Sequence, residues 1–241
     1  NFGLTAPPGG LGVADHIDFL NRVADDTARV FSGNFGFILD EFSGSAARAT
    51  QISQITTALT GTAAHELGHN LGLRHHDAYS DVVFDGTTPV ATGGIQNTHI
   101  MATGSTGLGE TGRETARDWS VNSLVKLEYA AGTLAVNPTS IAEAGDAGMT
   151  AGTAQAVALE SLPVSGQFGE VIEGTIATGG DRDWFAIELE AGSVLTVDIN
   201  TDYGTGFSPA KLVDSLVNVR DAAEAILFSG NDTLYSSTMF G

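Results

Sequence analysis

Residues 65–75 read HELGHNLGLRH, and the spacing within this stretch decides how the chain folds around it. His65 and His69 stand four positions apart, so on an α-helix their side chains share one face. Two ring nitrogens can then point at a common centre. The stretch therefore predicts a helix that carries two candidate metal ligands.

Gly72 and His75 follow the two helix histidines and can add a third metal ligand. If the same helix continued past His69, position 75 would be carried away from the metal. Glycine enters the left-handed region without a Cβ clash, so Gly72 can end the helix and send the chain back toward the ion. His75 then completes a site of three histidines.

Glu66 directly follows the first histidine, which places its carboxylate beside the metal. From there it can hold a metal-bound water and take its proton, so Glu66 is the candidate catalytic residue. Three protein ligands leave one coordination position open, as in catalytic zinc sites. The sequence thus predicts Zn²⁺ as a catalytic cofactor.

At this point the chain resembles the metzincin metalloproteases, whose signature is HExxHxxGxxH followed by a methionine turn. The downstream stretch Thr98–Ala102 contains Met101, 26 residues after His75. The resemblance implies an α+β catalytic domain in which Met101 forms a hydrophobic floor under the imidazoles. It also implies a zinc metalloendopeptidase, a hydrolase of peptide bonds.

Some positions depart from the metzincin pattern and leave the subfamily open. Position 76 is His where several metzincin families have a diagnostic residue, and no tyrosine stands two places after Met101. We interpret His76 as lying near the site or in solvent, and it can replace His75 if the turn has a different form. The role of His99 stays open.

The composition limits the classes of partner. A net charge of −19 with only two lysines, Lys126 and Lys211, argues against binding to nucleic acid or to anionic membranes. The chain has no cysteine, so it has no disulfide and no thiolate metal site. No apolar run is long enough to span a bilayer. These features fit a secreted, extracellular bacterial protein, and we expect a mature or excised fragment.

The first predicted domain covers residues 1–131 and is expected to be incomplete at its N-terminus. Apolar spacing predicts an amphipathic helix over residues 13–31 and a strand over residues 35–39. The histidine-bearing helix follows, with Leu59, Ala63, Leu67 and Leu71 on one side. Residues 77–112 are predicted as a loop around the site, and residues 113–130 as a helix that Asp118 or Ser120 can cap.

Residues 132–153 are predicted as a linker and residues 154–241 as an all-β sandwich that is truncated at its C-terminus. Short alternating segments predict antiparallel strands at 172–176, 184–189, 194–199, 216–219 and 225–228. The stretch Gly180–Phe185, GDRDWF, is similar to the bacterial pre-peptidase C-terminal (PPC) domain. Some relatives of that domain bind Ca²⁺, and the acidic residues that can do so here are Glu143, Asp146, Asp181 and Asp183. Turn formation without any metal is the more frequent role of such residues.

Two functions from different classes follow from these patterns. The first is a secreted zinc endopeptidase that acts on protein or peptide substrates, with Glu66 as general base. The alternative is a module that binds extracellular matrix or a surface polymer through the β-sandwich, attached to an inactive or structural zinc domain. The cleavage specificity is not predicted, because loops of unknown conformation form the substrate pockets.

Overall fold

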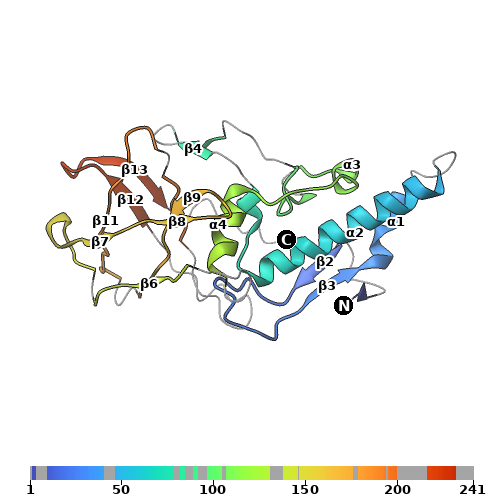
Figure 1. Ribbon diagram of the computed structural model, residues 1–241, viewed down its shortest axis with the longest axis horizontal. Coiled ribbons are helices and arrows are strands. Elements are labelled where there is room, and N and C mark those ends of the chain that lie inside the picture. The colour runs from blue at the N-terminus through green and yellow to red at the C-terminus, as the bar shows by residue number, and fades with distance from the viewer. Residues whose placement is uncertain are drawn as a thin grey trace.

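The computed structural model describes residues 2–3, 10–40, 47–78, 82–84, 89–91, 97–104, 107–130, 138–145, 147–175, 179–193, 195–199 and 216–231. In the N-terminal half the 23-residue helix α2 (Arg48–Asn70) runs beside a three-stranded sheet (Figure 1). The strand order is β1 (Phe2–Gly3), β3 (Ala28–Phe31), β2 (Gly12–Ala14), with β1 parallel and β2 antiparallel to β3. Within the described ranges β2 is thus an edge strand. No helix in these ranges is long and apolar enough to cross a membrane.

Helix α2 packs on the sheet through an apolar cluster. Buried Val30 of β3 and Ala58 of α2 belong to it, and the half-buried Leu59 and Ala63 pack against it. Leu67 was predicted on the same side of the helix but is 51% exposed. A row of residues at i, i+4, i+8 turns by about 80° around an α-helix, so its last member leaves the buried face.

The predicted helix over residues 13–31 is wrong, because β2 and β3 occupy its two ends. Between them the carboxylate of Asp18 accepts a hydrogen bond from the backbone N–H of Val23 at 2.6 Å. Leu20 and Asn21 adopt positive φ angles of 68° and 49°. Side-chain bonds to nearby backbone groups compete with helix formation, and here they favour a loop.

The predicted strand over residues 35–39 is also wrong. Residues Ser32–Phe35 form a 3₁₀ turn, η1, and Gly36–Asp40 form a short helix, α1. Phe35 and Ile38 lie three positions apart and are both buried in the same cluster. In a segment this short, strand alternation and helical spacing are difficult to tell apart.

After α2 the chain forms η2 (His75–Ala78), the antiparallel pair β4 (Val82–Phe84) and β5 (Pro89–Ala91), α3 (Glu110–Arg113) and α4 (Val121–Tyr129). The helix predicted from residue 113 therefore begins at residue 121. Ser120 caps it, since its Oγ accepts a hydrogen bond from Ser123 N–H at 3.0 Å. Of the two caps predicted, Ser120 is confirmed.

The C-terminal half consists of short strands in two-stranded ladders. They are β6 (Ile141–Ala142), β7 (Gln155–Val157), β8 (Glu160–Leu162), β9 (Gln167–Gly169), β10 (Ile172–Glu173), β11 (Phe185–Ile187), β12 (Leu216–Arg220) and β13 (Ile226–Asn231), with a 3₁₀ turn, η4, at Ala151–Thr153. β8 pairs with β9 and β12 with β13 in antiparallel fashion.

The other two ladders of this half differ from the antiparallel prediction. β6 pairs with β10 and β7 with β11, both in parallel. A tight hairpin turn imposes antiparallel pairing, but these partners are distant in sequence and no hairpin sets their direction. The predicted strands at 216–219 and 225–228 are confirmed. The described residues 195–199 contain no strand, although one was predicted there.

The two halves meet at α4, which lies between the end of α2 and strands β8 and β9 (Figure 1). A Cβ placed on Gly169 of β9 would lie 3.8 Å from the Val125 side chain of α4. The carboxylate of Glu128 on α4 accepts hydrogen bonds from the backbone N–H groups of Val164 and Ser165 at 3.2 and 2.7 Å. Helix α4 therefore connects the region around the histidines to the strand-rich half.

Candidate metal centre

The last two turns of α2 carry His65 and His69, both buried. The helix ends at Asn70 with Leu71 as its C-cap, and Gly72 then adopts a φ of +88°. A Cβ at this position would lie 2.5 Å from the Cα of Phe19, so both the backbone conformation and the space require glycine. The turn at Gly72 brings His75, the first residue of η2, back toward the helix.

The three imidazoles converge through their Nε2 atoms. His75 Nε2 lies 3.2 Å from His65 Nε2 and 3.1 Å from His69 Nε2. One nitrogen from each ring can be chosen so that all three lie within 4.8 Å of one another. The structure thus brings together the three residues that the sequence nominates as metal ligands.

Two backbone carbonyl groups determine which nitrogen of each helix histidine faces the centre. His65 Nδ1 lies 2.9 Å from the carbonyl oxygen of Ile100, and His69 Nδ1 lies 2.7 Å from that of Leu73. A carbonyl oxygen can only accept, so both Nδ1 atoms carry the proton and both Nε2 atoms present a lone pair. A metal ion satisfies such lone pairs together, and the donor set therefore fits a cation.

Burial supports the neutral form of these rings. It lowers the pKa of His65 well below its usual value, and the neighbouring His69 and His75 lower it further. Burial also lowers the pKa of His69. The neutral imidazole is the form that binds metal. Three nitrogen donors of this kind are compatible with zinc and with several other transition metals.

Glu66 follows His65 on α2, and its side chain contacts strand β2 at Gly12. Its side chain is buried, and burial raises its pKa to about 7, an effect that the backbone N–H of Ala14 opposes by hydrogen bonding to it. A Cβ on Gly12 would lie 2.6 Å from the Glu66 Cγ. The absence of a side chain at Gly12 therefore lets the edge strand pack directly on the candidate base.

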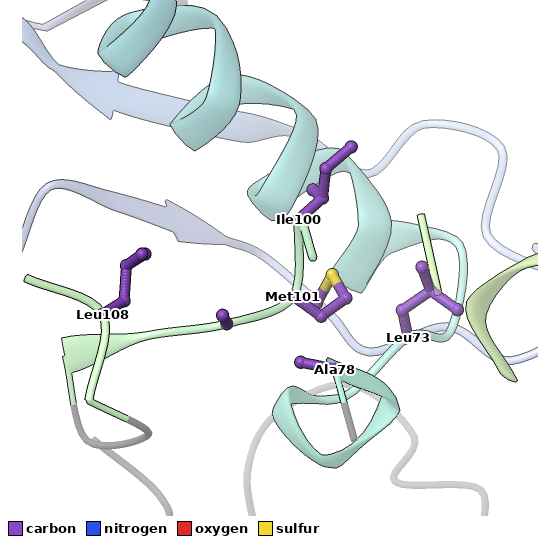
Figure 2. Packing of buried hydrophobic residues seen from close by; sticks show 6 residues of the cluster. Leu73, Ala78, Ile100, Met101 and Leu108 are labelled. Carbon is purple, nitrogen blue, oxygen red and sulfur yellow. The ribbon is translucent and has the colours of Figure 1, made fainter. Parts of the chain in front are cut away.

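Met101 lies against the histidine-bearing helix. It is fully buried in a cluster with Leu73, Ala78, Ile100, Ala102 and Leu108. Figure 2 shows Met101 beside Leu73 and Ala78, close to the end of α2. A Cβ added to Gly68, between the two helix histidines, would lie 2.8 Å from the Met101 sulfur. The methionine thus contacts the helix at the turn that carries the candidate ligands.

Arg117 holds the backbone of the same methionine turn, a role that the sequence did not suggest. Its Nη1 donates to the carbonyl oxygen of Ile100 at 3.0 Å, and the carbonyl oxygens of His99 and Ala102 lie at 3.4 Å. Ile100 O also accepts from His65 Nδ1, so one carbonyl links the arginine to a candidate ligand. Burial, with a contribution from Arg113, lowers the pKa of Arg117 to about 10. The only sequence signal is indirect: a turn with several buried carbonyl groups needs donors.

A groove of about 530 Å³ lies in the N-terminal half. It runs between the segment that leads into β2 and the segment around α3, and its walls combine apolar residues with two opposite charges: Leu11, Asn34, Phe37, Leu108, Gly109, Glu110 and Arg113. Leu11 precedes Gly12, which contacts Glu66, and Leu108 belongs to the Met101 cluster. The groove therefore shares Leu108 with the methionine cluster and includes the residue that precedes Gly12.

The remaining predicted positions do not join the centre in the part of the chain that is described. His99 pairs through its backbone with Asp118 and is not one of the three converging histidines. The His76 side chain and Asp146 lie outside the described residues. Glu143 lies close enough to Asp181 and Asp183 for both to affect its pKa, but its carboxylate accepts from the backbone N–H groups of Ala147 and Thr175. The bond from Ala147 closes a local turn, and the bond from Thr175 joins this turn to the segment after β10.

Comparisons of this chain with protein-family models, with curated proteins and with solved structures found no match.

Proposed function

We propose that this chain is a zinc-dependent endopeptidase whose metal is held by His65, His69 and His75. The observation that carries the proposal is the convergence of three Nε2 atoms, with the buried Glu66 next to the first of these histidines in the helix. The resemblance of HELGHNLGLRH and Met101 to metzincins supports peptide hydrolysis among the reactions such a site can catalyse. Zinc bound there supplies Lewis acidity toward a water molecule and a peptide carbonyl.

Glu66 moves the protons in this reaction. Its carboxylate accepts a proton from the attacking water and later donates it to the nitrogen of the departing amine. The Ala14 N–H and the bare Gly12 backbone hold the carboxylate in place. The carbonyl groups of Ile100 and Leu73 orient the rings of His65 and His69. Glu66, His65 and His69 therefore each have a backbone partner that fixes the direction of the side chain.

A peptide is the substrate that suits the surroundings of Glu66. Strand β2 contacts Glu66 and is an edge strand within the described ranges, so an extended chain can pair with its backbone. The groove that includes Leu11, directly before β2, offers apolar contacts together with one acidic and one basic side chain. This combination suits alternate side chains of an extended peptide.

Hydrolysis of unstructured casein by Glu66→Gln tests the proposal. The variant is expected to bind zinc as the unaltered chain does and to lose about 10²–10⁴-fold in rate, because only the proton acceptor is removed. Glu188→Gln, an exposed position in the C-terminal half, is the matched control and should cleave at the parental rate. Chelation by 1,10-phenanthroline should abolish cleavage by the parent chain.

A Glu66→Gln variant that still cleaves casein at a rate near that of the parent would contradict this mechanism. Full zinc occupancy without cleavage by the parent chain would instead favour the alternative, in which the zinc domain is inactive and the C-terminal half binds a matrix or surface polymer. Binding of collagen or cell-wall material by the whole chain would then be the next measurement.

A further inference from the structure

Lys126 of α4 is a buried cation with two acidic partners. Its side chain is 8% exposed, and its Nζ lies 2.8 Å from Asp77 Oδ1 and 3.0 Å from Asp77 Oδ2. The same Nζ forms an ion pair with Asp198 Oδ2. An ammonium group has three N–H donors, and these three carboxylate oxygens can accept from all of them. Buried charges need such partners, because burial without them is costly.

Asp77 ties this cation to the third candidate ligand. It stands two residues after His75 in η2, and its Oδ2 accepts from the backbone N–H of Arg74 at 2.7 Å. Its carbonyl oxygen accepts from the hydroxyl of Ser120. His65 and His69 are held by the regular geometry of α2, whereas His75 belongs to a single 3₁₀ turn. Asp77 is thus one of the residues that hold the turn to which His75 belongs.

Asp198 comes from the other half of the molecule. It lies in the described segment 195–199, more than 100 residues after His75, and its side chain is 24% exposed. Other contacts also join the halves, among them the exposed ion pair of Arg22 with Glu173. In the described contacts that pair does not touch the His75 turn, whereas Asp198 reaches the turn through one shared ammonium group.

The geometry points to Asp198 as a positioning residue for the third metal ligand: it holds Lys126 against Asp77 and so fixes the turn that directs His75. The C-terminal half is then part of the metal centre and not only an appended module. This inference rests on the three-histidine site of the proposed function, but it does not depend on hydrolysis. Substitution of residues that orient a ligand from outside the coordination sphere commonly lowers metal affinity by about 10–100-fold.

Zinc affinity of full-length variants tests this inference, measured by competition with a chromophoric chelator. Asp198→Ala is expected to raise the zinc dissociation constant by about 10-fold and to change the visible spectrum of the Co²⁺-substituted protein. Asp198→Asn keeps one acceptor oxygen and should give a smaller change. Glu173→Gln removes an ion pair between the halves without touching η2, and its zinc affinity should stay within about twofold of the parent.

A double-mutant cycle separates ligand positioning from general loss of stability. In the His75→Ala background, Asp198→Ala should cause no further loss of zinc affinity, because the ligand through which it acts is gone. A loss that persists undiminished in that background would overturn the inference. So would an Asp198→Ala dissociation constant within twofold of the parent, even with a lower melting temperature. If Asp198→Ala does not fold, Asp198→Asn decides by the same criteria.

The same titration separates this inference from the proposed function. No zinc binding by the unaltered chain would overturn both. Zinc binding without casein hydrolysis would overturn only the proposed endopeptidase, and the effect of Asp198 on zinc affinity would still be measured directly.

Discussion

The two halves of the molecule differ in what they bury. The N-terminal half buries ionisable groups at its centre, among them His65, Glu66 and His69. The described part of the C-terminal half leaves large apolar side chains exposed, with Phe168 at 70% and Leu227 at 61%. Ionisable groups are buried at a cost, so the surrounding packing must hold them in place. The candidate metal site is therefore expected to depend strongly on its neighbours, and the strand-rich half is expected to tolerate substitution at these exposed positions.

Methionine 101 and Phe168 test this contrast most directly. Met101→Ala leaves a cavity in a fully buried cluster and is expected to lower the free energy of unfolding by about 3–5 kcal/mol. Phe168→Ser removes a side chain that is mostly in solvent and should change the free energy of unfolding by about 0.5 kcal/mol or less. Urea unfolding of both variants measures the difference. Similar losses in the two variants would show that Phe168 is covered in solution and that the contrast between the halves is wrong.

The difference between local geometry and distant contacts explains how much of the candidate site the sequence could predict. The convergence of the three histidines could be predicted because one helix and one turn fix their relative positions, and both are local geometry. The convergence of the rings then follows from a spacing of four residues and a glycine with positive φ. The carbonyl partners of the rings could not be predicted, since Ile100 reaches His65 only through the fold of a distant loop.

Predictions failed where tertiary contacts or a choice of partner decided the structure. The spacing of residues 13–31 fits a helix, yet a local bond of Asp18 and pairing of β2 with β3 override it. In the C-terminal half the partners β7 and β11 are separated by a long stretch of chain, and composition does not determine their direction. Lys126 shows the same limit, because its partners Asp77 and Asp198 come from both halves.

Two glycines with positive φ, one in each half, allow the same comparison for the backbone. Gly72→Ala introduces a Cβ that would lie 2.5 Å from Phe19 Cα, so it is expected to lower the free energy of unfolding by about 2–4 kcal/mol and to weaken zinc binding. Gly145→Ala in the C-terminal half has a φ of +73° and no atom within 4 Å of the new Cβ. Its free energy of unfolding should fall only by the cost of holding an alanine in the left-handed conformation, about 1–2 kcal/mol. Its zinc affinity should not change.

Thermal unfolding and a chelator titration of the two glycine variants check this expectation. Equal losses of stability would mean that the segment around Phe19 moves aside and that Gly72 is needed only for its φ angle. Unchanged zinc affinity in Gly72→Ala would contradict the view that this turn sets the direction of His75.

In the metal-free protein, one carboxylate in each half is expected to make stability depend on pH, and the two dependences are opposite. The first carboxylate is that of Glu66. Burial raises the folded-state pKa of Glu66 to about 7, above its usual value of 4.5, so folding favours the protonated form. Its stability contribution is complete below pH 4.5 and is lost as the pH rises through 7. Glu66→Gln does not ionise and should therefore exceed the parent in stability by about 1–3 kcal/mol at pH 8, with little difference near pH 4.5.

Glu143 in the C-terminal half should contribute to stability with the opposite pH dependence. Hydrogen bonds from the backbone N–H groups of Ala147 and Thr175 lower its pKa, so folding favours the ionised form. Its contribution is present above the usual pKa of 4.5 and is lost on acidification. Glu143→Gln should thus be less stable than the parent at pH 8, and the two should converge as the pH falls below 4.5. Urea unfolding in the presence of EDTA at several pH values measures both variants. The same pH dependence of stability in both variants would mean that Glu66 is solvated in the metal-free protein. The contrast between a desolvated candidate base and a hydrogen-bonded carboxylate would then be lost.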